Sequence, residues 1–128
     1  DYIPYRDIPN ELKKMDILLM PYVSSITVAG DVGDITKFTS PLKLFDYLSV
    51  GKIIMCSDFN VLKEAIKEKK NAVFIKNYKN PYSWKNEIKK LKNQPHKQFI
   101  ISKNNYRLSK KFSLVSRAQK ILEEIKVN

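Results

Sequence analysis

Short apolar runs alternate with amphipathic segments along this chain of 128 residues. Three runs are apolar at every position, which is typical of strands buried on both faces of a parallel sheet; they are 17–20, 53–56 and 72–75. The other segments carry apolar residues at helical spacing, and they are 8–15, 41–50, a segment that Asn60 caps, 82–92, 97–109 and a last one from 114 to 125. Pro95 interrupts the helical pattern and places His96 in a loop. The alternation predicts an α/β fold: a three-stranded parallel sheet flanked by helices.

The segment predicted as a helix at 41–50 carries capping signals at both ends. Ser40 suits the N-cap and Pro41 suits the first helical position, where a missing N–H costs nothing. Gly51 suits the C-terminal stop. The first turn of this helix leaves backbone N–H groups without partners, and Lys43 stands beside them, so the turn is suited to bind a phosphate.

A carboxylate follows this turn at a spacing that matters for a nucleotide. Asp46 lies three residues after Lys43, about one helical turn away. Together they would hold a nucleotide at its ribose and its diphosphate. The irregular stretch 22–39 and the helix start both follow the carboxyl end of strand 17–20, where parallel α/β sheets bind phosphate ligands. Tyr22 either borders this site or packs in the core or loop.

The net charge of +11 comes from 24 lysines and arginines against 13 acidic residues. Only Arg6, Arg107 and Arg117 are arginines, and the lysines occur in nearly every segment. Sequence-specific nucleic-acid contacts favour the planar fork of arginine. We therefore expect a solvated basic surface, with contact to an anionic membrane face as the second interpretation and no nucleic-acid partner.

The remaining chemistry-bearing residues exclude several classes of site. Cys56 is the one cysteine and sits in an apolar run, which predicts a buried, inert thiol. Asp31 and Asp34 are read as turn residues, and nothing near His96 completes a metal or acid–base set, so we expect no metal and no cofactor. No apolar run approaches the roughly 20 residues that cross a bilayer. We expect a cytoplasmic protein, with the inner face of the membrane as its candidate place of contact.

Several blocks of the chain together match the pattern of a known family. The blocks are 4–9 (PYRDIP), 16–22 (DILLMPY), 40–47 (SPLKLFDY), 51–58 (GKIIMCSD), Glu64 in the next helix, and 113–122. They resemble the C-terminal domain of GT-B glycosyltransferases, most closely the retaining group 1 (family 4) type. The resemblance covers nearly the whole chain and is weakest in the middle of 97–109.

The resemblance implies catalysis in a cleft between two Rossmann-like domains. This C-terminal domain would hold a nucleotide-diphospho-sugar donor, and the N-terminal domain would hold a glycan or lipid-linked acceptor. Asp46 would occupy the position of the carboxylate that hydrogen-bonds the donor ribose. The backbone N–H groups of Leu42 and Lys43, in the turn that Pro41 opens, would face the diphosphate, with side-chain contacts from Ser40 and Lys43. No catalytic residue is identified.

The chain departs from the family pattern at three points. Asp46 stands where glutamate is usual, so its carboxylate is shorter by one C–C bond, about 1.5 Å. Phe38 stands where many relatives carry an acidic residue. The opening strands of the domain, with their arginine and lysine partners for the diphosphate, are absent, as is the acceptor domain. We therefore expect residues 1–128 to form a single partial domain, the second half of a nucleotide-sugar-binding domain.

These features predict a fragment of a bacterial glycosyltransferase that builds surface polysaccharide or another glycan and is inactive alone. The edge of strand 17–20 should then self-associate or be covered by a rearranged helix. Two alternatives stay open. One is a non-catalytic basic module that binds anionic membrane or nucleic acid. The other is a sugar-nucleotide epimerase of the same two-domain architecture, whose acid–base residues the chain does not reveal.

Overall fold

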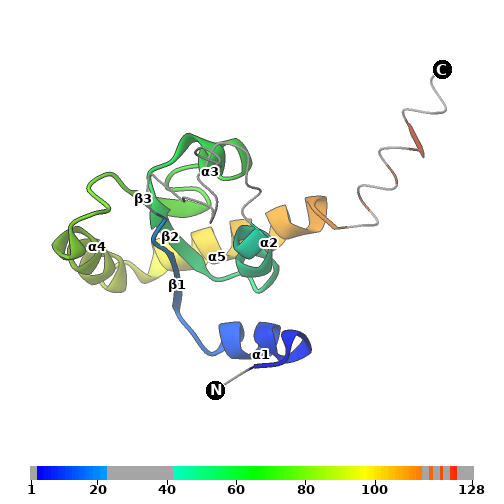
Figure 1. The fold of residues 1–128 in the computed structure, drawn as a ribbon, viewed down its shortest axis with the longest axis horizontal. Coiled ribbons are helices and arrows are strands. Elements are labelled where there is room, and N and C mark those ends of the chain that lie inside the picture. The colour runs from blue at the N-terminus through cyan, green and yellow to red at the C-terminus, as the bar shows by residue number, and fades with distance from the viewer. Residues whose placement is uncertain (1–2, 23–41, 114–115, 117–118, 120–121, 124–128) are drawn as a thin grey trace, which may run out of the picture.

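A three-stranded parallel sheet with helices on both faces forms the centre of the molecule (Figure 1). The computed structural model describes residues 3–22, 42–113, 116, 119 and 122–123. The strands lie in the order of the chain, and they are β1 (Ile17–Met20), β2 (Ile53–Ser57) and β3 (Ala72–Ile75). The predicted α/β class and the parallel sheet are confirmed, and β2 extends one residue beyond the predicted run.

The helices alternate with the strands as the periodicity indicates. They are α1 (Ile8–Lys13), which follows a 3-10 turn at Tyr5–Asp7, then α2 (Leu42–Ser49), α3 (Asn60–Ala65), α4 (Pro81–Lys92) and α5 (Pro95–Lys111). Successive residues of a strand point to opposite faces of the sheet, so each buried strand contributes to two separate cores.

The two cores lie on opposite faces of the sheet. Alternate strand residues, among them Ile54 and Cys56, pack with α2 and α3 in the first core. Their neighbours, among them Met55, pack with α4 and the first half of α5 in the second core. Trp84 of α4 is buried in this second core. Because β2 and β3 are covered on both faces, they have no polar position before Ser57, whereas Leu19 of the edge strand β1 stays exposed.

Helix α5 joins the two layers beneath the sheet. Its first half places Ile101 in the second core, and its second half packs Leu108 against the first core. The ring of Phe112, just after α5, lies 5.1 Å from the ring of Phe45 of α2 in an edge-to-face arrangement. Figure 1 shows α5 passing from α4 across to α2.

Three details of the predicted elements are wrong. Asn60 is the first residue of α3, and Phe59 holds the N-cap position. The helical pattern is interrupted before Pro95 as predicted, but α5 begins at Pro95 itself and not at residue 97, because the fixed φ of proline fits the first turn. His96 therefore lies in a helix and not in a loop. The predicted helix at 114–125, residues 23–39, Ser40 and Pro41 lie outside the continuous stretches that the structure describes.

Candidate functional site

Helix α2 positions Asp46 beside the N-terminal part of the chain. Leu44 and Leu48, four residues apart, are fully buried and hold α2 against the first core. Asp46 is two residues from each of them, so it lies on the opposite side of the helix, towards α1, where it is half-buried. The Tyr5 hydroxyl donates to Asp46 Oδ1 at 3.5 Å, which is a long hydrogen bond.

A small cavity separates Asp46 from α1. Its volume is about 50 Å³, and its lining residues are Tyr5, Ile8, Pro9, Leu12, Asp46 and Ser49. The Ser49 hydroxyl donates to the main-chain oxygen of Asp46 at 2.6 Å, and not to the carboxylate of Asp46. None of the ion pairs among the described residues includes Asp46. In the part of the chain that the structure describes, the site thus presents a half-buried carboxylate with one weak partner at the wall of a small cavity.

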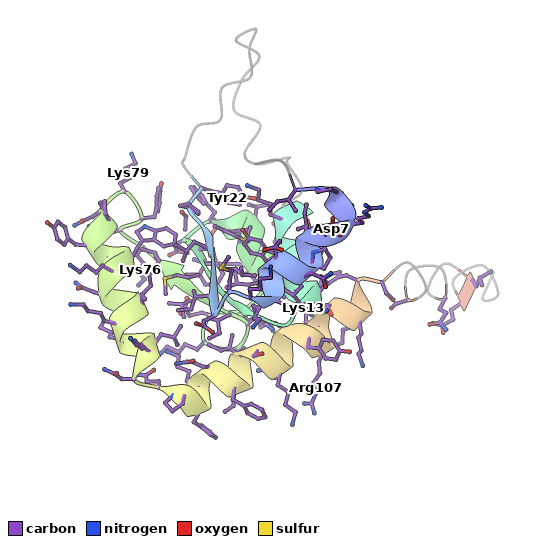
Figure 2. The ribbon with its side chains drawn as sticks, turned by 90° about the horizontal axis from the view of Figure 1, so that it is seen from below. Asp7, Lys13, Tyr22, Lys76, Lys79 and Arg107 are labelled. Carbon is purple, nitrogen blue, oxygen red and sulfur yellow. The ribbon has the colours of Figure 1, made fainter. Side chains whose placement is uncertain are left out.

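Tyr22 follows the carboxyl end of β1 and packs against the first core (Figure 2). Its main-chain oxygen accepts a hydrogen bond of 2.8 Å from the hydroxyl of Ser57, the last residue of β2. Burial raises the pKa of Tyr22, and the neighbouring Tyr47 and Cys56 raise it further. Burial also raises the pKa of Tyr47, with a smaller contribution from Asp46. Both phenols are therefore neutral donors at neutral pH.

The other predicted ligand residues are placed only in part. Lys43 lies in the first turn of α2 with its side chain exposed to solvent. Leu42 begins the helix. Ser40 and Pro41 belong to the stretch before α2 that the structure does not describe. The described contacts bring Asp46 together with Tyr5 and record none between Lys43 and Asp46.

The sequence interpretation missed the contribution of Tyr5. This residue lies in the segment 4–9 that resembles the family, but no role for it follows from spacing alone. Its position against Asp46 depends on how α1 packs on α2, which joins segments 41 residues apart in the chain. The signal in the sequence was the place of Tyr5 in the segment 4–9, between Pro4 and Pro9.

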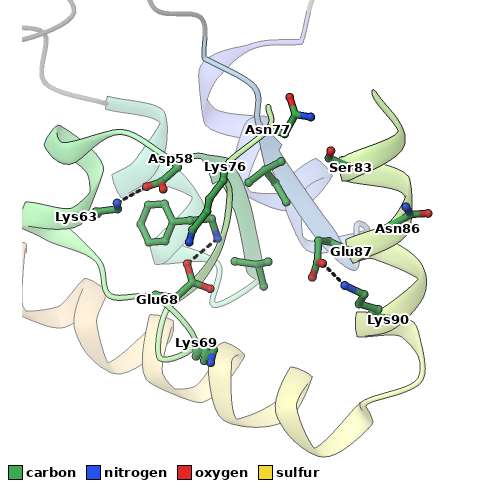
Figure 3. Close-up of a pocket in the computed structure, with 13 residues that line it drawn as sticks. Asp58, Lys63, Glu68, Lys69, Lys76, Asn77, Ser83, Asn86, Glu87 and Lys90 are labelled. Atoms are coloured by element: carbon green, nitrogen blue, oxygen red, sulfur yellow. Dashed lines mark hydrogen bonds and ion pairs between the residues drawn. The ribbon is translucent and has the colours of Figure 1, made fainter. Parts of the chain in front are cut away.

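A second cavity, of about 670 Å³, lies along the outer edge of β3 and the facing side of α4 (Figure 3). Its carboxylates are all engaged. Asp58 pairs with Lys63, Glu87 pairs with Lys90 at 2.6 Å, and Glu68 accepts the Phe74 N–H at 3.0 Å. Two of these carboxylates are paired with lysines, and the third accepts a main-chain N–H of β3. This cavity therefore offers no unpaired acid for proton transfer.

Other chemistry has little support among the described residues. Cys56 is fully buried as predicted, and burial raises the pKa of its thiol to about 12, so it is no nucleophile at neutral pH. No group of three histidine, cysteine, aspartate or glutamate side chains in the described part of the chain is arranged to hold a metal. None of the described helices is both long enough and apolar enough to cross a bilayer.

Comparison with known proteins adds no relative. No protein-family model matches the chain, and no curated protein or solved structure matches it. The function must therefore be inferred from the residues of the site.

Proposed function

We propose that this chain is the second half of the donor-binding domain of a GT-B glycosyltransferase of the retaining group 1 (family 4) type. In this proposal α2 binds the nucleotide-diphospho-sugar, and a separate domain binds the glycan or lipid-linked acceptor. The parallel order β1–β2–β3 supports the assignment, because half of a doubly wound sheet would have consecutive parallel strands of this kind.

The observation that carries the proposal is the state of Asp46. A half-buried carboxylate usually has a cation or several donors as partners. Among the described residues Asp46 has one hydroxyl partner at 3.5 Å, and it lines the cavity of about 50 Å³, which has room for water only, so a ribose would have to approach its solvent side. The two vicinal hydroxyls of a ribose would supply further donors to this carboxylate, and hydrogen bonds to a charged acceptor are the stronger kind.

The first turn of α2 would act on the other end of the donor. Cleavage of the glycosidic bond leaves a nucleoside diphosphate, so negative charge builds on the phosphate oxygens. Backbone N–H groups at a helix start are directed at such charge, and the helix dipole favours it. Lys43, exposed in this turn, would approach the diphosphate as a mobile cation and stabilise the leaving group.

Isothermal titration of the chain with UDP, GDP and ADP, and with the corresponding nucleosides, tests this assignment. Asp46→Asn should weaken binding of both nucleosides and nucleotides. A hydrogen bond to a charged group contributes about 1.5–3 kcal/mol, which corresponds to roughly 10- to 150-fold in Kd. Lys43→Gln should weaken the diphosphates and leave the nucleosides unchanged.

Two matched variants control for net charge. Asp16→Asn makes the same change at the amino end of β1, and Lys79→Gln makes it before α4; both side chains are exposed. Neither should alter nucleotide binding. Equal losses in Asp46→Asn and Asp16→Asn, or no nucleotide binding at millimolar concentration, would contradict the donor site. The isolated chain should transfer no sugar, and measurable turnover by it would contradict its assignment as half of a site.

A further inference from the structure

Helix α5 presents an uncompensated basic face. It spans 17 residues and contains five lysines and arginines but no acidic residue. Its inward side is fixed by Ile101 and Asn105, which are fully buried. Lys103, Arg107, Lys110 and Lys111 therefore lie on the flanks and the outward side, whereas Lys97 lies one turn before Ile101 on the inward side; Figure 2 shows Arg107 pointing away from the sheet.

Large apolar side chains lie exposed among these cations. Phe99 is 64% exposed and Tyr106 is 53% exposed. Lys103 lies over the Phe99 ring at 5.8 Å from its centroid, and Lys110 lies over the Tyr106 ring at 4.8 Å. The spacing of four, three and four residues places all four side chains along one line of the helix. We call Phe99, Lys103, Tyr106, Arg107 and Lys110 the basic–aromatic ridge.

We propose that the basic–aromatic ridge docks this protein on a lipid membrane that carries anionic headgroups. Aromatic rings are favoured at the level of the headgroups, where one side is apolar and the other is wet. Lysines extend their stems along such a surface and keep the ammonium groups at the phosphates. Charge complementarity favours an anionic membrane as the partner, because each basic residue near such a surface increases the affinity about fivefold.

The shape of the ridge favours a membrane over a nucleic acid. A 17-residue helix is about 25 Å long and can lie flat on a plane. Single-stranded nucleic acid binds in a charged groove with open aromatic faces on which bases stack. A lysine of the same helix lies over one face of each of the Phe99 and Tyr106 rings, so that face is not open to a stacking base. The ridge carries three positive charges, from two lysines and one arginine. The lysines lack the planar guanidinium group that recognises bases.

Flotation with vesicles of phosphatidylcholine, with and without phosphatidylglycerol, tests the docking surface. The full chain should bind only the anionic vesicles, and binding should fall as salt rises. The triple variant Lys103→Gln/Arg107→Gln/Lys110→Gln should lose roughly 100-fold in affinity, from three contributions of about fivefold. Phe99→Ser/Tyr106→Ser should lose the part of the binding that persists at high salt.

The matched control is Arg6→Gln/Lys76→Gln/Lys79→Gln, which also removes one arginine and two lysines. None of these residues belongs to α5, and Lys76 and Lys79 lie before the start of α4, at the end away from α5 (Figure 2). Circular dichroism of each variant checks that it is folded. A control that loses as much as the ridge variant would overturn the proposal, because net charge alone would then explain binding. Absence of vesicle binding, or tighter binding of single-stranded DNA that displaces vesicles, would overturn it as well. Nucleotide titration is independent of these variants, so either proposal can fail alone.

Discussion

Replacement of Asn105 by leucine should destabilise the fold strongly, although leucine has nearly the same size. Asn105 is fully buried on α5 and makes three hydrogen bonds. Its amide nitrogen donates to the main-chain oxygens of Lys52 and Asn71, both at 2.8 Å, and its oxygen accepts from the Asn71 side chain at 3.2 Å. Leucine would leave two carbonyls and one amide without these partners, away from water.

Each buried polar group left without a partner costs about 1–3 kcal/mol. Loss of three partners at Asn105→Leu should therefore lower the free energy of unfolding by about 3–5 kcal/mol, since relaxation recovers part of the sum. Urea unfolding followed by the fluorescence of Trp84, the one tryptophan of the chain, measures this change.

Asn104→Leu is the matched control for this variant. Asn104 is adjacent in the chain and makes one exposed hydrogen bond, from its side chain to the main-chain oxygen of Lys70 at 3.0 Å. Water can replace that bond, so the loss should stay below about 1 kcal/mol. Equal effects of the two substitutions, or a change below about 1 kcal/mol in Asn105→Leu, would refute the assigned role of the buried amide.

Three further outcomes follow from the packing. Gly51→Ala should cost about 1–2 kcal/mol in urea unfolding, because φ is +65° and the added Cβ would lie 3.2 Å from Tyr106 Cβ; an unchanged midpoint would contradict this. Burial raises the pKa of Cys56 to about 12, so Cys56 should react with a thiol reagent only after unfolding. Its contribution to the free energy of unfolding should fall as the pH rises from about 9 towards 12. Rapid modification of the native protein would exclude this burial. Leu19, 41% exposed on the edge strand β1, should promote self-association, and Leu19→Lys should shift the mass measured by light scattering towards the monomer; a monomeric wild-type chain would argue against association through that edge.

The strands and α2 could be predicted because local patterns alone determine them. Each strand is an uninterrupted apolar run, which is typical of a parallel sheet with helices on both faces, although Leu19 of the edge strand stays exposed. In α2 the pair Leu44 and Leu48 marks one buried face, so Asp46 had to lie off that face. The free Cys56 inside a strand was predicted for the same reason.

What the sequence could not reveal depends on contacts between distant segments. Pro95 is equally compatible with the end of one helix and the start of the next. In the structure the side-chain amide of Gln98 donates to the main-chain oxygen of Leu91 at 2.7 Å and so joins α4 to α5 in a tight turn. Asn105 in the middle of a helix looks like a surface residue until Asn71 is placed opposite it. Tyr5 becomes a partner of Asp46 only once α1 packs on α2.

The two edges of the sheet differ in a way that bears on the candidate site. At β3, Ala72 exchanges main-chain hydrogen bonds with Lys67 and Lys69, and Glu68 takes the outward N–H of Phe74, so the edge is occupied by its own preceding turn. At β1, no described strand pairs with the outer edge, and Leu19 stays exposed. Protected edges terminate a sheet, whereas bare ones accept another strand. Helix α2 lies close to β1, because the Tyr47 hydroxyl donates to the main-chain oxygen of Leu19 at 3.4 Å. Any strand that pairs with β1 would therefore come to lie beside α2, the helix that carries Asp46.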